Sequence, residues 1–185
     1  MRVKTQTGTD VEFLTGGRWV LEDNGICNRP QQVSNLPAGK VFVLPKEGTM
    51  SGKIVIDGSW QGDLLSDHLS FQVENGIVVD VSGGTLADDI KSLYEQAKEG
   101  IRSTKRDLAW TVAEFGFGMN PKATYLIGNK VEDLVVRGSA YFGFGDNTHI
   151  GGKARVGIHQ RGVMRSPEVS LEEITLLSEG KLSFR

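Results

Sequence analysis

Three histidines supply all the imidazole groups of this sequence, and their spacing limits the metal chemistry open to it. His68, His149 and His159 form no His-x-x-x-His motif, and no Cys-x-x-Cys motif occurs. Any metal site must therefore be assembled from distant segments. His159 ends the run 154–159, which we interpret as a strand with Gly157 on the same face and open space beside the imidazole. His149 lies in a polar loop, and we assign no role to His68.

Glu114 is a carboxylate set among glycines. It lies in the segment 113–118, Ala-Glu-Phe-Gly-Phe-Gly, and the segment 140–145, Ala-Tyr-Phe-Gly-Phe-Gly, repeats the pattern with Tyr141 in place of the glutamate. Successive side chains of a strand point to opposite faces, so the phenylalanines should face a core while Glu114 shares the other face with glycines. Glycine in a strand often marks a close approach to the backbone. We expect two strands that line one cavity, the alternative being two ordinary glycine-kinked strands of a curved sheet.

Motifs of several other enzyme classes are absent. The sequence has no Gly-x-Ser-x-Gly, no phosphate-binding Gly-Lys-Ser/Thr and no Gly-x-Gly-x-x-Gly between a strand and a helix. Cys27 is the single cysteine, which excludes an internal disulfide and fits a reducing compartment. It lies in a turn without a histidine nearby in sequence, so we expect a free thiol rather than a nucleophile.

Composition excludes several kinds of partner. The chain has 185 residues and a formal net charge of −2, so it lacks the basic character of proteins that bind nucleic acid or anionic membranes. No apolar run approaches the roughly 18 residues of a spanning helix, and the N-terminus lacks the apolar centre of a signal peptide. We therefore expect a cytoplasmic protein. The 24 glycines against 5 prolines indicate the tight turns of a β-rich fold.

Short β-prone runs separated by turn residues cover most of the chain. Asn75-Gly76, between two such runs, is the strongest hairpin signal. Segment 123–136 is ambiguous, and segment 162–165 is expected to pair back on the run before it. The runs expected to form strands are 3–5, 11–15, 19–22, 40–44, 53–57, 68–74, 77–81, 108–118, 138–145, 153–160, 168–171, 174–178 and 181–184.

One amphipathic helix is expected over about residues 85–100. Thr85 can cap it, with Asp88 at the position of a capping box. Its apolar stripe consists of Leu86, Ile90, Leu93, Ala97 and Ile101. The sum is a single α+β domain spanning 1–185, a mostly antiparallel, curved or barrel-like sheet covered on one side by this principal helix.

Four segments in order resemble one known family. They are 35–42 (Asn-Leu-Pro-Ala-Gly-Lys-Val-Phe), 113–123, 138–147 and Ile158-His159. Together they resemble the C-terminal catalytic domain of the aminopeptidase T family, also called aminopeptidase S or thermophilic aminopeptidase, and the likeness extends from about Thr5 to Phe184. Members usually carry an additional N-terminal domain, which we expect to be absent here.

The resemblance implies a two-metal aminopeptidase with five principal metal ligands. Glu114 and His159 agree with this set, whereas Lys40 replaces a glutamate, Tyr141 replaces a histidine and Arg161 replaces an aspartate. Two of five ligands would hold a divalent ion weakly, because catalytic zinc sites generally have three protein ligands. Two of the replacements also place permanent cations where carboxylates stood, which opposes a dication.

We therefore expect an aminopeptidase-T-like protein with a degenerate metal site and little or no peptidase activity. Our hypothesis is that Lys40 or Arg161 occupies the vacated space and pairs with Glu114. The cofactor expectation is no metal, or a weakly bound zinc, cobalt or manganese ion if His149 or Asp146 rebuilds the site from the loop.

Whether the chain is an enzyme stays open between three alternatives. One is an active, leucyl-aminopeptidase-like metal-dependent hydrolase with a rebuilt site. Another is a dimeric assembly or small-anion-binding module in which Lys40 and Arg161 bind a carboxylate. The last is a ring-opening oxygenase related to this family, which would want two histidines and one carboxylate around iron, here Glu114, His149 and His159.

The resemblance also implies a homodimer. Twofold dimers are the commonest assembly, and a β-rich domain with exposed edges gains by pairing them. The expected ligand is a peptide or a small anion, with no nucleic acid and no membrane.

Overall fold

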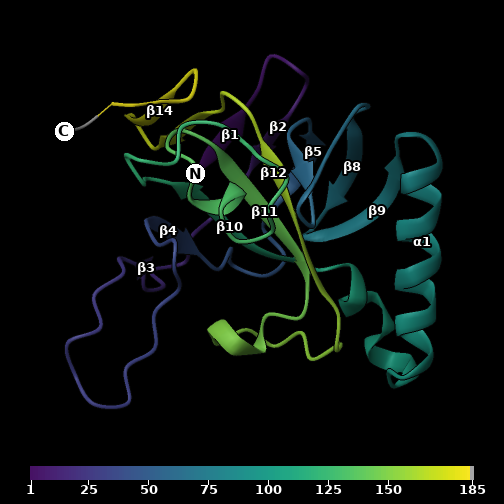
Figure 1. Ribbon diagram of the computed structural model, residues 1–185. Helices are drawn as coiled ribbons and strands as arrows, with labels where there is room; N and C mark the ends of the chain where they lie inside the picture. Colours follow the sequence, from purple (N-terminus) through teal and green to yellow (C-terminus); the bar gives the residue numbers. More distant parts are fainter. Residues whose placement is uncertain (184–185) are drawn as a thin grey trace.

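The protein, a computed structural model that describes residues 1–183, consists of two antiparallel sheets and one long helix (Figure 1). The first sheet contains, in spatial order, β15 (Lys181–Leu182), β14 (Ile174–Ser178), β13 (Glu168–Leu171), β1 (Arg2–Lys4), β2 (Asp10–Glu12), β5 (Ser51–Ile56), β8 (Leu69–Glu74) and β9 (Ile77–Ser82). The second contains β3 (Leu21–Asp23), β4 (Lys40–Val43), β10 (Val112–Gly118), β11 (Ala140–Gly145), β12 (His159–Met164), β6 (Ser59–Trp60) and β7 (Asp63–Leu64). The helices are α1 (Gly84–Glu99) and the 3-10 turns η1 (Ser103–Trp110), η2 (Asp133–Val135) and η3 (Thr148–Ile150). The expected α+β class, mostly antiparallel with one principal helix, is confirmed.

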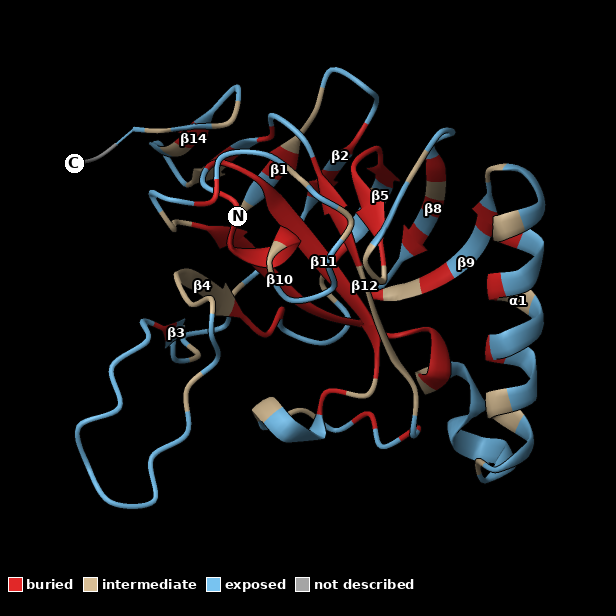
Figure 2. Ribbon diagram, viewed as in Figure 1, coloured by how far each residue is buried: buried red, intermediate tan, exposed pale blue. Residues whose placement is uncertain are grey.

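The two sheets share one core because their aromatic side chains meet between them. Phe71 of β8 stacks on Phe144 of β11 with ring centroids 4.5 Å apart, and Phe13 meets Phe115 of β10 edge-on at 5.6 Å. Figure 2 shows β10 and β11 buried along their whole length. Each buried phenylalanine contributes about 1.5–3 kcal/mol. Since alternate residues point to opposite faces, this core directs Glu114 to the far side of the second sheet.

The hairpin at Asn75-Gly76 joins β8 to β9 as expected. Both turn residues have positive φ, 51° and 79°, which the short hairpin turn requires. Strand β9 is the last strand of its sheet, and Figure 1 places α1 beside it.

Helix α1 has nearly the expected bounds, but its start differs from the prediction. Gly83 precedes it and no side chain caps it, so the capping by Thr85 and Asp88 was wrong. Thr85 already lies inside the first turn.

The buried face of α1 also differs. Ala87, Ile90 and Tyr94 are buried, whereas Leu93 is 41% exposed. The reason is Tyr94, whose hydroxyl donates a hydrogen bond to the carbonyl of Phe144 at 3.1 Å. This bond ties the helix to β11 and turns its other side to solvent.

Several expected strands have other bounds. Residues 153–158 are loop, and 159–164 form the single strand β12, so segment 162–165 does not pair back on 153–160. Residues 103–110 form η1 rather than the start of the strand expected over 108–118. Strand β15 ends at Leu182, and Phe184 lies outside the described residues.

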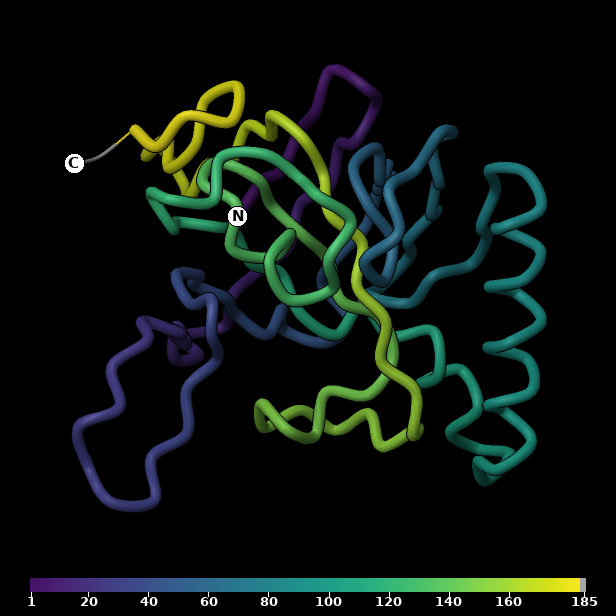
Figure 3. The backbone as a smooth tube through the Cα atoms, viewed as in Figure 1, coloured from purple at the N-terminus to yellow at the C-terminus, as the bar shows by residue number. Residues whose placement is uncertain are grey.

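The loop between β3 and β4 projects from the molecule in Figure 3. Its side chains are largely exposed, and Val33 and Leu36 are 91% and 94% exposed. The base of this loop returns to the second sheet through Gly39, whose φ of 114° favours glycine. None of the described helices is both long and apolar enough to cross a membrane.

Candidate metal centre

The strand register of the second sheet brings Glu114 and Arg161 onto one row. Glu114 of β10 lies opposite Gly143 of β11, and Gly143 lies opposite Arg161 of β12. Residues paired across strands share a face, so the two charged side chains flank a residue without a side chain. His159 pairs with Gly145, two residues further along, and therefore lies on this same face.

Gly143 leaves the space that the site occupies. A Cβ atom there would lie 2.6 Å from Cγ of Glu114 and 3.0 Å from Cε1 of His159. Gly116 plays a similar part for Tyr141, whose ring atoms would lie 2.6–2.7 Å from a Cβ at that position. The expectation that glycines clear one face for close approach is confirmed at these two positions.

Three donor groups gather in this space, two from the sheet and one from η3. Nε2 of His159 lies 3.7 Å from Oε1 of Glu114, and Nε2 of His149 lies 3.8 Å from Oε2. The ligand atoms all lie within 4.8 Å of one another. Glu114 is 1% exposed, whereas the side chain of His149 is 47% exposed. Two imidazoles and one carboxylate at this separation can hold a single cation, and this is the set used by non-haem iron oxygenases.

The tautomer of His159 is set by the backbone. Its Nδ1 lies 2.6 Å from the carbonyl oxygen of Asp146, which can only accept, so Nδ1 carries the proton. Nε2 is therefore the ring nitrogen directed toward the carboxylate of Glu114. Nε2 of His159 and Oε2 of Glu114 are both buried without a hydrogen-bond partner. Buried polar atoms without a partner are costly, and a cation within this cluster would satisfy both, so the donor set fits a metal ion.

Arg161 supplies a permanent cation to the same carboxylate. Its Nε donates a hydrogen bond to Oε1 of Glu114, so the expected pairing of Glu114 with one of the two cations is found at Arg161. Burial alone would raise the pKa of Glu114, but His149, His159 and Arg161 outweigh it and hold the pKa well below its usual range. The carboxylate is therefore ionised at neutral pH.

Lys40 lies in the same cavity but pairs elsewhere. Its Nζ is 3.8 Å from Oδ2 of Asp23, and both side chains are about one-tenth exposed. Asp23 also accepts a hydrogen bond from Asn35 at 2.6 Å and one from Ser34 at 3.3 Å. Burial and the charge of Arg161 lower the pKa of Lys40. Asp23 gave no signal in the sequence, because only the unpredicted pairing of β3 with β4 places it beside Lys40.

Asp146 supports the site from its loop. Its Oδ2 accepts hydrogen bonds from the backbone N–H groups of Val156 at 2.8 Å and Gly157 at 3.2 Å, and Oδ1 accepts from Thr148 at 2.9 Å. The side chain that was expected to assist as a ligand thus organises the turns that carry His149 and His159.

The cavity above this cluster, the Glu114 cavity, has a volume of about 290 Å³. Its lining residues include Asp23, Lys40, Phe42, Glu114, Tyr141, His149 and Arg161. Both glycine-containing strands contribute a residue to it, as the sequence predicted. Burial, followed by the charge of Glu114, raises the pKa of Tyr141 well above its usual range, so its phenol stays protonated.

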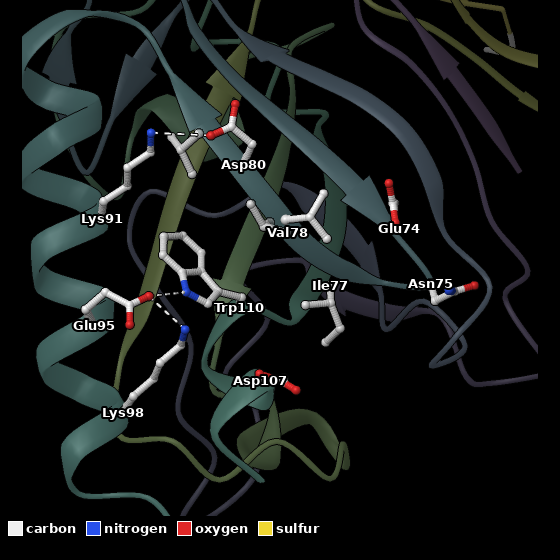
Figure 4. Close-up of a pocket in the computed structure, with 12 residues that line it drawn as sticks. Glu74, Asn75, Ile77, Val78, Asp80, Lys91, Glu95, Lys98, Asp107 and Trp110 are labelled. Atoms are coloured by element: carbon white, nitrogen blue, oxygen red, sulfur yellow. Dashed lines mark hydrogen bonds and ion pairs between the residues drawn. The ribbon is translucent and has the colours of Figure 1, made fainter. Parts of the chain in front are cut away.

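A larger groove of about 630 Å³ lies between α1 and β9, away from these donors (Figure 4). Several of its polar side chains pair with one another. Lys98 and Trp110 both contact Glu95, at 2.7 and 3.3 Å, and Lys91 lies 3.3 Å from Asp80. Among the described residues that line it there is no histidine. The smaller Glu114 cavity is therefore the better candidate for chemistry.

The fold and the donor set together define a class, that of two-sheet α+β proteins with a candidate single-metal site on the outer face of a sheet. Within that class, the chain belongs to the NicX family, 2,5-dihydroxypyridine 5,6-dioxygenase, whose family model matches residues 1–184.

Individual relatives agree with this family. A curated 2,5-dihydroxypyridine 5,6-dioxygenase of Pseudomonas putida KT2440 is 20% identical over 195 residues, covering 97% of this chain and 53% of the relative. The solved structure of 2,5-dihydroxypyridine dioxygenase from the same strain matches with a TM-score of 0.85 at 18% identity, covering 98% of this chain and 54% of that one. The chain thus spans about half the length of these relatives.

The aminopeptidase T resemblance holds for the fold alone. Wild-type AmpT from Thermus thermophilus matches with a TM-score of 0.67 at 16% identity, covering 99% of this chain and 49% of that one. The functional prediction drawn from it, a degenerate metallopeptidase or a hydrolase with a rebuilt site, was wrong, because the family and the curated relative are dioxygenases. The segments that carried the resemblance build the sheet, and a sheet is shared by proteins with different reactions.

Proposed function

We propose that this chain provides the metal-binding half of a ring-opening dioxygenase, with Glu114, His149 and His159 holding one iron(II) ion. The observation that carries the proposal is the cluster of Glu114, His149 and His159, whose ligand atoms lie within 4.8 Å of one another and which contains two buried polar atoms without a hydrogen-bond partner, Oε2 of Glu114 and Nε2 of His159. The relatives named for 2,5-dihydroxypyridine support the same reaction class. When bound, iron(II) would supply the redox chemistry that lets dioxygen react with an electron-rich ring.

The protein side chains would prepare the site before the substrate arrives. Glu114 offers a carboxylate that is already ionised, because its neighbours hold its pKa low. His159 directs Nε2 into the site, since its Nδ1 is hydrogen-bonded to the carbonyl of Asp146. Glu114 would therefore bind a cation without first giving up a proton at neutral pH.

Tyr141 and Phe42 would hold the ring. Both line the Glu114 cavity, and the phenol of Tyr141 remains a proton donor because burial raises its pKa. A hydroxylated pyridine offers oxygen acceptors for that donor and a flat apolar face for the aromatic wall. The substrate class is therefore a single hydroxylated ring, which suits a cavity of about 290 Å³.

The test uses protein loaded with iron(II) without oxygen and then exposed to air with 2,5-dihydroxypyridine. We expect oxygen uptake that matches the loss of ring absorbance. His159→Ala should abolish both, whereas His68→Ala, which changes an exposed histidine outside the donor cluster, should leave both unchanged. A loss of ring absorbance that persists in the His159→Ala variant would overturn the proposal, and so would iron-loaded protein that consumes no oxygen.

A further inference from the structure

Two cations line the Glu114 cavity, and the proposed metal site does not account for either of them. Arg161 of β12 is paired with the buried carboxylate of Glu114. Lys40 of β4 is paired with the buried carboxylate of Asp23. A buried cation whose partner is taken away is costly, because the desolvation of its charge is then uncompensated. A metal ion that binds Glu114 would therefore change the charge balance around Arg161 and Lys40, and with it the kind of ligand that the cavity can bind.

Arg161 has free donors on the cavity side. Within residues 1–183, only Nε of its guanidinium forms a hydrogen bond, and that bond goes to Glu114. The terminal nitrogens remain available, and the side chain is 24% exposed. A guanidinium presents its donors in a planar fork that matches a carboxylate.

The charges of the cavity are balanced without metal, and a dication would leave an excess of positive charge. The metal ion, Lys40 and Arg161 would then carry four positive charges, against one negative charge each on Glu114 and Asp23. Glu22 also lines the cavity, but it is exposed, so solvent screens it. A largely desolvated cavity with excess positive charge favours an anion.

Phe42 and Tyr141 add an aromatic wall to these charges. The Nζ of Lys40 lies 5.9 Å from the ring centroid of Phe42. An anionic group near Lys40 and Arg161 would thus lie beside an apolar surface that suits a ring. The volume of about 290 Å³ is near the lower end for ligand pockets, which limits the ligand to about one ring.

We infer that the substrate of this site is a hydroxylated aromatic ring that also carries a carboxylate, with Arg161 and Lys40 as the residues that determine this specificity. The inference rests on the proposed function, since it names the substrate class of the same site. Arg161 exchanges Glu114 for the substrate carboxylate when the metal is bound. By linkage, metal and carboxylate then bind cooperatively, and each raises the affinity for the other.

The experiment compares benzoate with its neutral isostere benzamide by calorimetry on zinc-loaded and metal-free protein. Zinc serves as a redox-silent probe, and the metal content of every variant is measured before titration. We expect the zinc-loaded protein to bind benzoate at least about tenfold more tightly than benzamide, and the metal-free protein to show a smaller preference. Arg161→Gln and Lys40→Gln should each reduce the preference severalfold, and Arg161→Lys should retain part of it.

The matched control is Lys53→Gln, an exposed lysine on β5 that does not line the cavity, and it should leave the preference unchanged. Equal affinity for benzoate and benzamide, or a preference that survives both Arg161→Gln and Lys40→Gln in metal-loaded protein, would overturn the inference. If benzoate binds only as a ligand of the zinc ion, its preference over benzamide would survive both substitutions. Oxygen uptake with 2,5-dihydroxypyridine reports separately on the proposed function, so a carboxylate preference without oxygen uptake would show a carboxylate-binding site and overturn the dioxygenase reaction.

Discussion

Glu114 is almost completely buried and still ionised, and this combination requires positive charge around it. Arg161 provides that charge within the described chain, and a metal ion would provide more. Arg161 and a bound metal ion would compete for the carboxylate of Glu114, because Nε of Arg161 already donates a hydrogen bond to Oε1. Arg161, one of the residues that keep Glu114 ionised, therefore also weakens the metal site.

Replacing Arg161 by glutamine should tighten metal binding. The substitution removes a positive charge beside the ligand set while it keeps a hydrogen-bond donor, and we expect the affinity for a divalent ion to rise about tenfold or more. A competition titration with a chromophoric chelator measures this. Lys53→Gln serves as the control, and equal or weaker affinity in Arg161→Gln would show that Arg161 does not oppose the metal.

Asp146 should make the stability of the loop between β11 and β12 depend on pH. Burial alone would raise its pKa, but hydrogen bonds from Thr148, Val156 and Gly157 outweigh this and lower the pKa to about 2 from 3.8. Because the folded-state pKa is the lower one, the stabilisation is complete above about pH 4 and is lost as the pH falls toward 2.

Asp146→Asn should therefore lower the free energy of unfolding by about 1 kcal/mol near neutral pH, an amount reduced by solvent screening, and by much less near pH 2. Urea unfolding at the two pH values measures the difference. An equal loss at both would mean that the charge of Asp146 does not stabilise the loop.

At the scale of elements, the glycine pattern of β10 and β11 carried most of the information about the site. Alternation placed Glu114 and Tyr141 on the face opposite the phenylalanine core, and the structure confirms both. The sequence did not reveal the register, which sets Gly143 between Glu114 and Arg161. Register depends on long-range pairing and turn geometry, neither of which a local pattern records.

The loop after β11 shows the same limit. Residues 153–158 alternate like a strand but form a loop, since the carboxylate of Asp146 binds the backbone N–H groups of Val156 and Gly157 in place of a strand partner. The fold of this loop brings His149 to Glu114, and spacing along the chain could not show it. The functional prediction failed for a related reason, because the recognised segments specify the sheet rather than the reaction.

Gly143→Ala tests the role of the central strand. The new methyl group would lie 2.6 Å from Cγ of Glu114 and 3.0 Å from Cε1 of His159, so both ligands must move apart. We expect metal affinity to fall by about a hundredfold, because small displacements of ligands are costly, with stability lowered by about 1–3 kcal/mol. Chelator competition and thermal unfolding measure the two effects. Unchanged metal affinity in a folded variant would contradict the assigned geometry.

For the whole molecule, the exposed apolar residues of the loop between β3 and β4 lead us to predict self-association. Val33 and Leu36 are among the most exposed apolar side chains described, and Trp19 nearby in sequence is 88% exposed. We expect a homodimer by sedimentation velocity, weakened about tenfold or more by changing Val33 and Leu36 to serine. Ile174→Ser, at another exposed apolar position, is the control. A monomer at all concentrations would refute this prediction.

The most direct test of the central claim is the stoichiometry of metal binding. Protein loaded anaerobically with iron(II) and freed of excess metal should contain about one equivalent per chain by elemental analysis, as a set of three donors predicts. Glu114→Ala and His159→Ala should each lose it, while His68→Ala should retain it. No bound metal, or one equivalent that persists in both Glu114→Ala and His159→Ala, would show that these residues do not form a metal centre.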